Sequence, residues 1–94
     1  MSISSFEYVV RGTVQGVGFR VFTRRIAERE GIVGWVKNDR LGDVVGVAQG
    51  TEAALSRFKT ALAKGPRHAE VEGVDVSEER PLLTPEFEDF RIRH

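Results

Sequence analysis

The sequence has 94 residues, of which 40% are hydrophobic and 30% charged; it has no cysteine, and its 14 basic side chains balance 14 acidic ones. A chain of this length can bury one modest core, so we expect a single domain over residues 1–94. The lack of cysteine excludes a disulfide framework, a thiolate zinc site and a cysteine nucleophile. The zero net charge argues against a protein that coats nucleic acid.

The start of the sequence and its apolar runs indicate no association with a membrane. No apolar run approaches the ~20 residues that a bilayer-spanning helix needs. The first residues, Met-Ser-Ile-Ser-Ser-Phe-Glu, lack the basic and apolar regions of a signal peptide. Because disulfides mark oxidising compartments, a chain without cysteine also fits the cytoplasm, which is where we expect it.

Hydrophobic periodicity predicts five strands and two helices. The alternation of Phe6, Tyr8 and Val10 is typical of a strand, and Phe22 and Ile26 are spaced as on a helix. In chain order the sequence predicts a strand over residues 6–14, a helix from residue 21 to Gly31, strands over residues 33–38 and 44–48, a helix between Thr51 and Gly65, a strand over residues 71–76, a loop over residues 81–85 and a closing strand over residues 87–92.

Turn and cap residues sharpen these boundaries. Gly31 suits a left-handed helix C-cap, and Thr51 suits an N-cap. The turn residues 39–42 predict a hairpin between the strands on either side of them. At Gly73 the alternation of valines changes parity, which predicts a β-bulge there.

The order β-α-β-β-α-β with an added last strand predicts an α+β fold. Two helical crossovers separated by a hairpin are typical of the ferredoxin-like split βαβ layout, a mostly antiparallel sheet with both helices on one face. Right-handed crossovers would place the first and third strands side by side in its centre.

Residues 12–20, Gly-Thr-Val-Gln-Gly-Val-Gly-Phe-Arg, are the most informative segment. A strand here leads through a glycine-containing loop to a helix N-terminus, whose free N–H groups and partial positive charge attract anions. Glycines allow successive N–H groups to turn inward, and the Arg20 guanidinium can bind two phosphate oxygens together. The segment thus favours an anion site, although a tight strand-to-helix connection with Arg20 on the surface would have the same spacing.

Neither of two widespread phosphate-binding motifs fits this loop. The Walker pattern requires a lysine that the segment lacks. The dinucleotide fingerprint requires a third glycine where the chain has Val21.

Asn38 is a second candidate site residue, because it lies at the end of an apolar strand, where ligands often bind. Its alternative role is to bond the backbone of its own turn.

Both segments resemble signature sequences of the acylphosphatase family. The first signature is matched by Gly12-x-Val14-Gln15-Gly16-Val17-x-Phe19-Arg20. The second is matched by Gly34-Trp35-Val36-Lys37-Asn38-x3-Gly42-x-Val44-x5-Gly50. Phe90-Arg91-Ile92 also fits the closing strand of the family, so the resemblance extends over essentially the whole chain.

The resemblance implies a site residue by residue. Arg20 would bind the substrate phosphate, Asn38 would orient the attacking water, and Asp39 would add a negative charge beside it. The main-chain N–H groups of the loop would complete the phosphate cradle; they belong to Gln15, Gly16, Val17, Gly18, Phe19 and Arg20.

The function implied by the resemblance is a hydrolase that splits small acyl phosphates into a carboxylate and inorganic phosphate, without a metal or cofactor. We expect a monomer whose partner is the small-molecule substrate, with no nucleic acid or membrane partner. The alternative is a module that binds acyl or carbamoyl phosphate for a partner protein, as in larger hydrogenase-maturation proteins. Residues 18–22 weakly resemble an aromatic RNA-recognition strand. They lie at a loop-helix junction, however, and not on a strand where aromatic side chains could stack on RNA bases, so RNA binding is not expected.

Other residues suggest structural roles. His68 and His94 lie in a connecting loop and at the last position, and are not expected to form a metal or acid–base pair. Trp35 is expected to pack on the sheet and Gly46 to permit close packing. The acidic residues between positions 70 and 79 are expected to be solvated.

Overall fold

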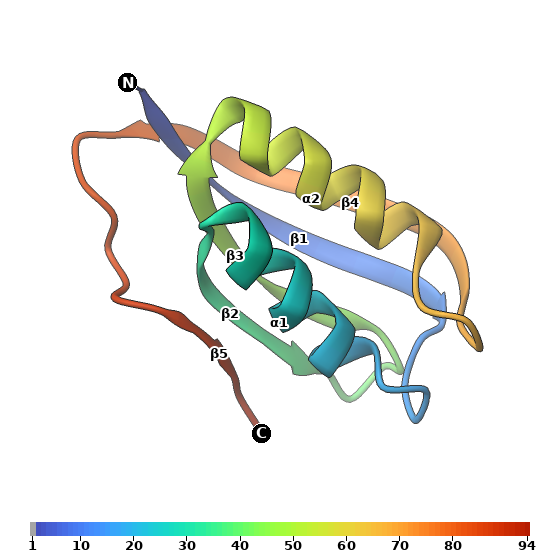
Figure 1. The fold of residues 1–94 in the computed structure, drawn as a ribbon. Helices are drawn as coiled ribbons and strands as arrows, with labels where there is room; N and C mark the ends of the chain where they lie inside the picture. Colours follow the sequence, from blue (N-terminus) through green and yellow to red (C-terminus); the bar gives the residue numbers. More distant parts are fainter. Residues whose placement is uncertain (1) are drawn as a thin grey trace.

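Two helices cover one face of a five-stranded sheet in the computed structural model, which describes residues 2–94 (Figure 1). The elements are β1 (Ile3–Thr13), α1 (Phe19–Glu30), β2 (Val33–Asn38), β3 (Val44–Thr51), α2 (Glu52–Lys64), β4 (Glu70–Leu82) and β5 (Phe90–Ile92). The predicted ferredoxin-like α+β fold is confirmed. Neither helix is long and apolar enough to span a membrane.

The strands lie in the order β4-β1-β3-β2-β5. Three of the four strand pairs are antiparallel, and the pair of β2 with β5 is parallel. The central pair of β1 and β3 is the one predicted from right-handed crossovers. This topology brings the loop before α1 and the turn between β2 and β3 to the same end of the sheet (Figure 1).

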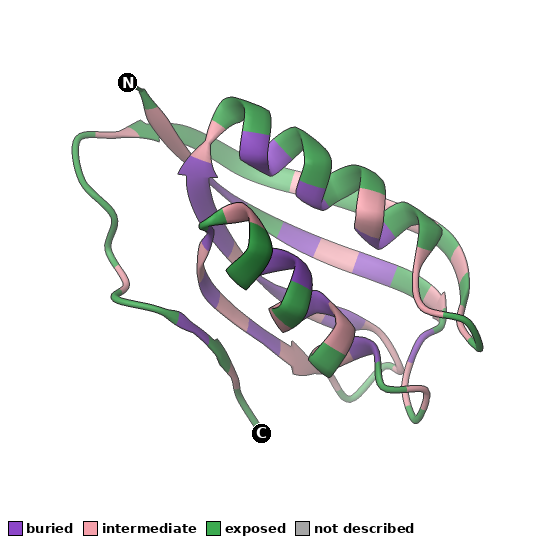
Figure 2. Cartoon of the chain, viewed as in Figure 1, coloured by how far each residue is buried: buried purple, intermediate pink, exposed green. Residues whose placement is uncertain are grey.

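The core lies between the sheet and the helices, where the inner stripe of each helix is buried and the outer faces are exposed (Figure 2). Phe6, Tyr8 and Val10 share the buried face of β1, as their alternation predicts. Phe58 from α2 packs its ring 5.4 Å from that of Tyr8 and 6.1 Å from that of Phe90. The core therefore joins β1, α2 and β5.

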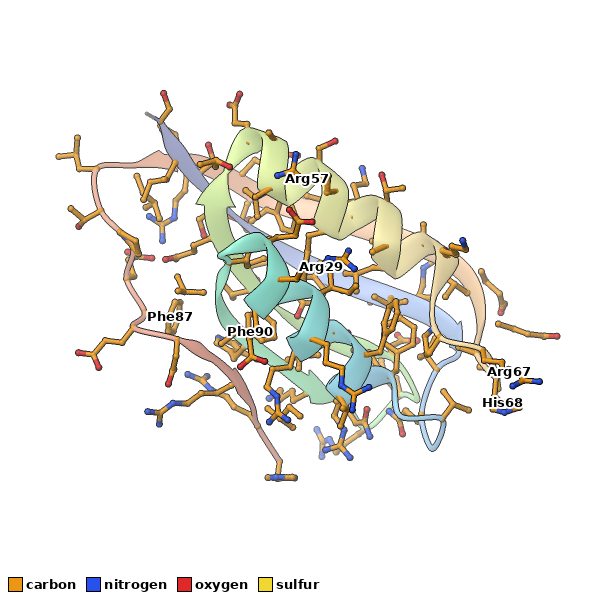
Figure 3. The ribbon with its side chains drawn as sticks, in the orientation of Figure 1. Arg29, Arg57, Arg67, His68, Phe87 and Phe90 are labelled. Carbon is orange, nitrogen blue, oxygen red and sulfur yellow. The ribbon has the colours of Figure 1, made fainter. Side chains whose placement is uncertain are left out.

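Both predicted helix caps are observed. Gly31 ends α1 in a left-handed conformation, with φ 71°. Thr51 caps α2, because its hydroxyl oxygen accepts a hydrogen bond of 3.1 Å from the Ala54 N–H. The two helices are also joined by Glu30, whose carboxylate binds Arg57 at 2.6 Å; Figure 3 shows Arg57 and Arg29 on neighbouring helices.

The last third of the chain differs most from its predicted boundaries. β4 continues to Leu82, so Pro81 lies in a strand rather than in the predicted loop. A proline is tolerated there because β4 is an edge strand, whose outer N–H groups have no ladder to complete. The closing strand begins at Phe90 rather than at residue 87.

The predicted bulge in β4 is confirmed. Arg11 pairs with Gly73 and Gly12 with Val71, so one residue of β4 is left out of register. This shift lets the valines on both sides of Gly73 pack against the core. A second irregularity, at Glu78 with φ 53°, was not predicted, because nothing in the residue type announces it. The acidic residues of β4 are exposed on this edge, as expected.

Candidate active site

A cavity of about 200 Å³ opens at the end of the sheet where the two signature segments meet. It brings together five predicted site residues, namely Gly16, Gly18, Phe19, Arg20 and Asn38. Val14, Val21, Ile92 and His94 complete the lining. Arg20 and Asn38 thus line the same cavity although they are 18 positions apart in the sequence.

The loop before α1 has the backbone conformation that glycine favours. Gly16 and Gly18 have φ angles of 74° and 75°, in the left-handed region. A Cβ added at either position would meet no atom within 4 Å. Glycine is therefore required here by backbone conformation rather than by crowding.

The N-terminus of α1 has no side-chain cap. Gly18 occupies the cap position, no hydrogen bond from a side chain is formed there, and the first turn holds no acidic residue. The first helical bond runs from the Phe22 N–H to the Gly18 oxygen, so the N–H groups of residues 19–21 precede the ladder. At α2, by contrast, Thr51 and Glu52 provide both a cap and a negative charge. The positive end of α1 therefore has no such compensation.

The side chain of Gln15 joins the loop to the β2–β3 turn. Its amide nitrogen donates to the main-chain oxygens of Asp39 and Asp43, both at 2.9 Å. Gln15 and Val17 do not line the cavity, and Val17 packs instead against the core. Their predicted contribution through main-chain N–H groups stays a prediction.

Asn38 is the last residue of β2, half-buried and paired with Val44 of β3. The turn that follows is organised by Asp39 rather than by Asn38. One oxygen of the Asp39 carboxylate accepts from the N–H groups of Leu41 at 2.8 Å and Asp43 at 3.0 Å. The negative charge of Asp39 is thus held in the turn, and Asp39 does not line the cavity.

His94 and Ile92 are cavity residues that sequence reasoning missed. The Arg20 guanidinium nitrogen Nη1 lies 3.4 Å from Nδ1 of His94, a long hydrogen bond. The parallel pairing of β5 beside β2 carries the end of the chain to this place. No periodicity in the sequence reveals the position of a residue beyond its last strand.

A second cavity, of about 560 Å³, lies between α2 and β4 and contains neither Arg20 nor Asn38. Its lining includes Ser56, Lys59 and Arg80 but none of the signature residues that carry the prediction. In the described part of the chain, residues 2–94, no three His, Asp or Glu side chains lie close enough together to hold a metal ion.

The acylphosphatase family model matches residues 6–92. The chain belongs to the acylphosphatase family. It is 50% identical over 86 residues to an acylphosphatase of Thermotoga maritima, a match that covers 90% of this chain and 91% of the other. The family-model match includes the whole sheet except the first three residues of β1, together with both helices.

Solved structures agree with this assignment. The acylphosphatase of Bacillus subtilis superposes with a TM-score of 0.89 at 35% identity, over 97% of this chain and 99% of the other. The full-length HypF structure superposes with a TM-score of 0.83 at 27% identity, over all of this chain and 12% of the other. The predicted family, fold and acylphosphatase activity are therefore confirmed.

Proposed function

We propose that this acylphosphatase hydrolyses small acyl phosphates without a metal ion, in the cavity lined by Arg20 and Asn38. The observation that carries the proposal is that these two residues line one cavity at the uncapped N-terminus of α1. A cation, a helix N-terminus and a polar amide on one cavity are the elements that phosphoryl transfer needs, because it depends on positioning and on charge stabilisation.

Arg20 and the first turn of α1 would hold the phosphate group. The guanidinium donates two parallel hydrogen bonds to phosphate oxygens, and free N–H groups at the helix start donate to the same anion. The N–H groups of the helix start are held by the backbone before substrate binds, so they stabilise the charge that develops on the phosphoryl oxygens without reorganisation.

Asn38 would orient the attacking water. A carboxamide has no useful basicity, so its role is to accept from the water or donate to it, and so to fix its approach to phosphorus. The water oxygen bonds to phosphorus as the bond between phosphorus and the acyl oxygen breaks. The electron pair leaves on the carboxylate, and the proton of the water passes to a phosphate oxygen.

The leaving group explains why no acidic side chain is needed. A carboxylate is a weak base that departs without being protonated, so general acid catalysis at the acyl oxygen contributes little. Acetyl phosphate and carbamoyl phosphate both present this reacting group. The cavity of about 200 Å³ has room for the phosphate and a small acyl group beside it.

The test is hydrolysis of benzoyl phosphate in EDTA by the native chain and by Arg20→Ala, Arg20→Lys and Asn38→Ala. Removal of one transition-state donor lowers kcat by about 10²–10³. We expect such losses in Arg20→Ala and Asn38→Ala, and incomplete rescue by lysine, which lacks the planar fork. Arg24→Ala, in the next turn of the same helix, is the matched control and should keep native kinetics.

Two results would reject the assignment. Native turnover in the Arg20→Ala variant would remove that residue from the site. Loss of all activity in EDTA, restored by a divalent cation, would reject the metal-independent mechanism.

A second candidate function is a module that binds acyl or carbamoyl phosphate for a partner protein. The likeness to a 12% portion of full-length HypF favours it, since that structure is of a phosphate- and nucleotide-bound form. Phosphate binding without hydrolysis of acetyl or carbamoyl phosphate would support this candidate over an independent enzyme. The cytoplasmic location and the monomeric state stay predictions.

A further inference from the structure

His94 is exposed, yet its imidazole lines the same cavity as Arg20 and Asn38. The side chain reaches this place because β5 runs parallel to β2, so the chain leaves the sheet beside the end of β2. Of the two histidines in residues 2–94, His94 is the one that lines this cavity. His68 lies instead in the connection between α2 and β4, beside Arg67 (Figure 3).

The contact between Arg20 and His94 has a definite direction. A guanidinium carries only donors, so Nδ1 of His94 must accept the 3.4 Å hydrogen bond from Nη1 of Arg20. An accepting Nδ1 belongs to a neutral imidazole with its proton on Nε2. A protonated imidazole would instead place two cations against each other.

Few other charges face this imidazole. Among the residues that line the cavity, Arg20 is the one other side chain with a full charge. From β2, Lys37 lies over the Trp35 ring, 5.7 Å from its centroid; the Arg93 guanidinium lies 4.6 Å from the same centroid. From the β2–β3 turn, Asp39 is engaged by the N–H groups of that turn.

We propose that His94 is a second, pH-dependent cation of the anion site. When a tetrahedral dianion enters the cavity, Arg20 turns its donors to the anion and Nδ1 of His94 loses its hydrogen bond. The imidazole then takes up a proton from solvent, and its Nδ1–H donates to the anion. This inference rests on the proposed function, because it requires the anion to bind in this cavity.

The proposal couples anion affinity to pH. Histidine is the side chain whose charge ordinarily changes between pH 5 and 8. A dianion binds the site more tightly when the imidazole is protonated, so the affinity for a dianion rises as the pH falls. Because the imidazole is exposed, the gain in affinity is modest, about two- to fivefold. By linkage, the bound anion favours the protonated imidazole of His94.

Sulfate is the suitable probe, because it remains a tetrahedral dianion through this range whereas phosphate itself titrates. We would follow the imidazole resonances of the full chain by NMR from pH 5 to 8, with and without saturating sulfate. The two histidines make the assignment simple, and His94→Gln identifies the signal. The His94 midpoint should rise with sulfate, while that of His68 stays unchanged.

Sulfate affinity measured by calorimetry at both ends of the range provides an independent readout. The native chain and the matched control His68→Gln should bind sulfate about two- to fivefold more tightly in acid than in base. The His94→Gln variant keeps an acceptor for Arg20 but cannot take up a proton, so it should lose this pH dependence.

The outcomes distinguish failure of this inference from failure of the proposed function. If sulfate perturbs the main-chain amides of residues 15–20 while the His94 midpoint does not move, the role of His94 is wrong and the anion site stands. If sulfate leaves those amides unperturbed, the proposed site is wrong and the inference falls with it. Equal pH dependence in the native chain and His94→Gln would also overturn the role of His94.

Discussion

The side-chain amide of Gln15 donates to the main-chain oxygen of Asp39 over 2.9 Å, and so ties the loop before α1 to the residue after Asn38. A second bond from the same nitrogen reaches the Asp43 oxygen, also over 2.9 Å. Arg20 begins the helix on one side of this link, and Asn38 ends the strand on the other. Gln15 is therefore one of the contacts that set the relative position of the two proposed catalytic residues.

We predict that Gln15→Ala lowers kcat/KM by about 10- to 100-fold, because small misplacements of positioned groups are costly. The free energy of unfolding should fall by only about 1–2 kcal/mol for the two lost hydrogen bonds. Benzoyl phosphate kinetics and urea unfolding measure the two effects separately.

Gln49→Ala is the matched control for this variant. Gln49 is buried and bonds Ser5 and Glu86, away from the cavity. Its loss should reduce stability but leave the kcat/KM of the folded protein intact. Native kcat/KM in a destabilised Gln15→Ala variant would show that the link supports only the fold.

Gly46→Ala is expected to be strongly destabilising. A Cβ at this position would lie 2.1 Å from the Trp35 oxygen and 2.4 Å from the Tyr8 hydroxyl, which donates to that same oxygen. Overpacking of this kind costs about 1–3 kcal/mol or more in the free energy of unfolding. Gly31→Ala, where the added Cβ meets open space, is the comparison and should cost about 1–2 kcal/mol from its left-handed backbone alone.

The double variant Tyr8→Phe/Gly46→Ala tests the geometry further. Removal of the hydroxyl removes one of three close contacts, while the Trp35 oxygen and the ring carbon Cζ of residue 8, 2.6 Å from the added Cβ, remain. The double variant should therefore lose slightly less stability than the sum of the single variants. Strict additivity in urea unfolding would contradict the close approach of Tyr8 to Gly46.

Glu86 should make the free energy of unfolding depend on pH in the acid range. Hydrogen bonds from Arg80 and then from Gln49 hold the pKa of its carboxyl below the ordinary value of 4.5. A lowered pKa in the folded state means that the stabilisation is complete above pH 4.5 and is lost as the pH falls below it. Glu86→Gln should therefore show a shallower decline of unfolding free energy between neutral pH and acid than the native chain.

Glu88→Gln is the control for this pH dependence, since it changes an exposed carboxylate in the same segment. It should follow the native pH profile. If Glu86→Gln also follows it, the hydrogen bonds of Glu86 do not contribute to folding.

Thr51→Ala should lower the free energy of unfolding by about 0.5–2 kcal/mol, because the hydroxyl is the cap of α2. Thr51→Ser keeps the oxygen and should restore most of this loss. Thermal unfolding of both variants gives the comparison, and equal stability of the serine and alanine variants would argue against capping. Activity should be unchanged in both, since α1 rather than α2 points to the cavity.

Local chemistry accounts for the parts of the fold that were predicted correctly. Gly31 and Thr51 cap their helices because a left-handed residue and a hydroxyl acceptor act within one turn. The bulge at Gly73 could be predicted because a change in the alternation of buried residues along a strand requires an extra residue in that strand. The extra length of β4 was not visible, because pairing with β1 overrides the turn propensity of Pro81.

In the candidate site, too, some features follow from the local sequence and others only from the tertiary structure. The sequence by itself determined the loop with its two glycines, the arginine after it and the asparagine at the end of the next strand, since each depends on neighbours in the chain. The tertiary structure alone decided that Gln15 reaches the Asp39 and Asp43 oxygens and that His94 meets Arg20. Those contacts join residues 24 to 74 positions apart, and only the pairing of strands sets which side chains meet at that distance in sequence.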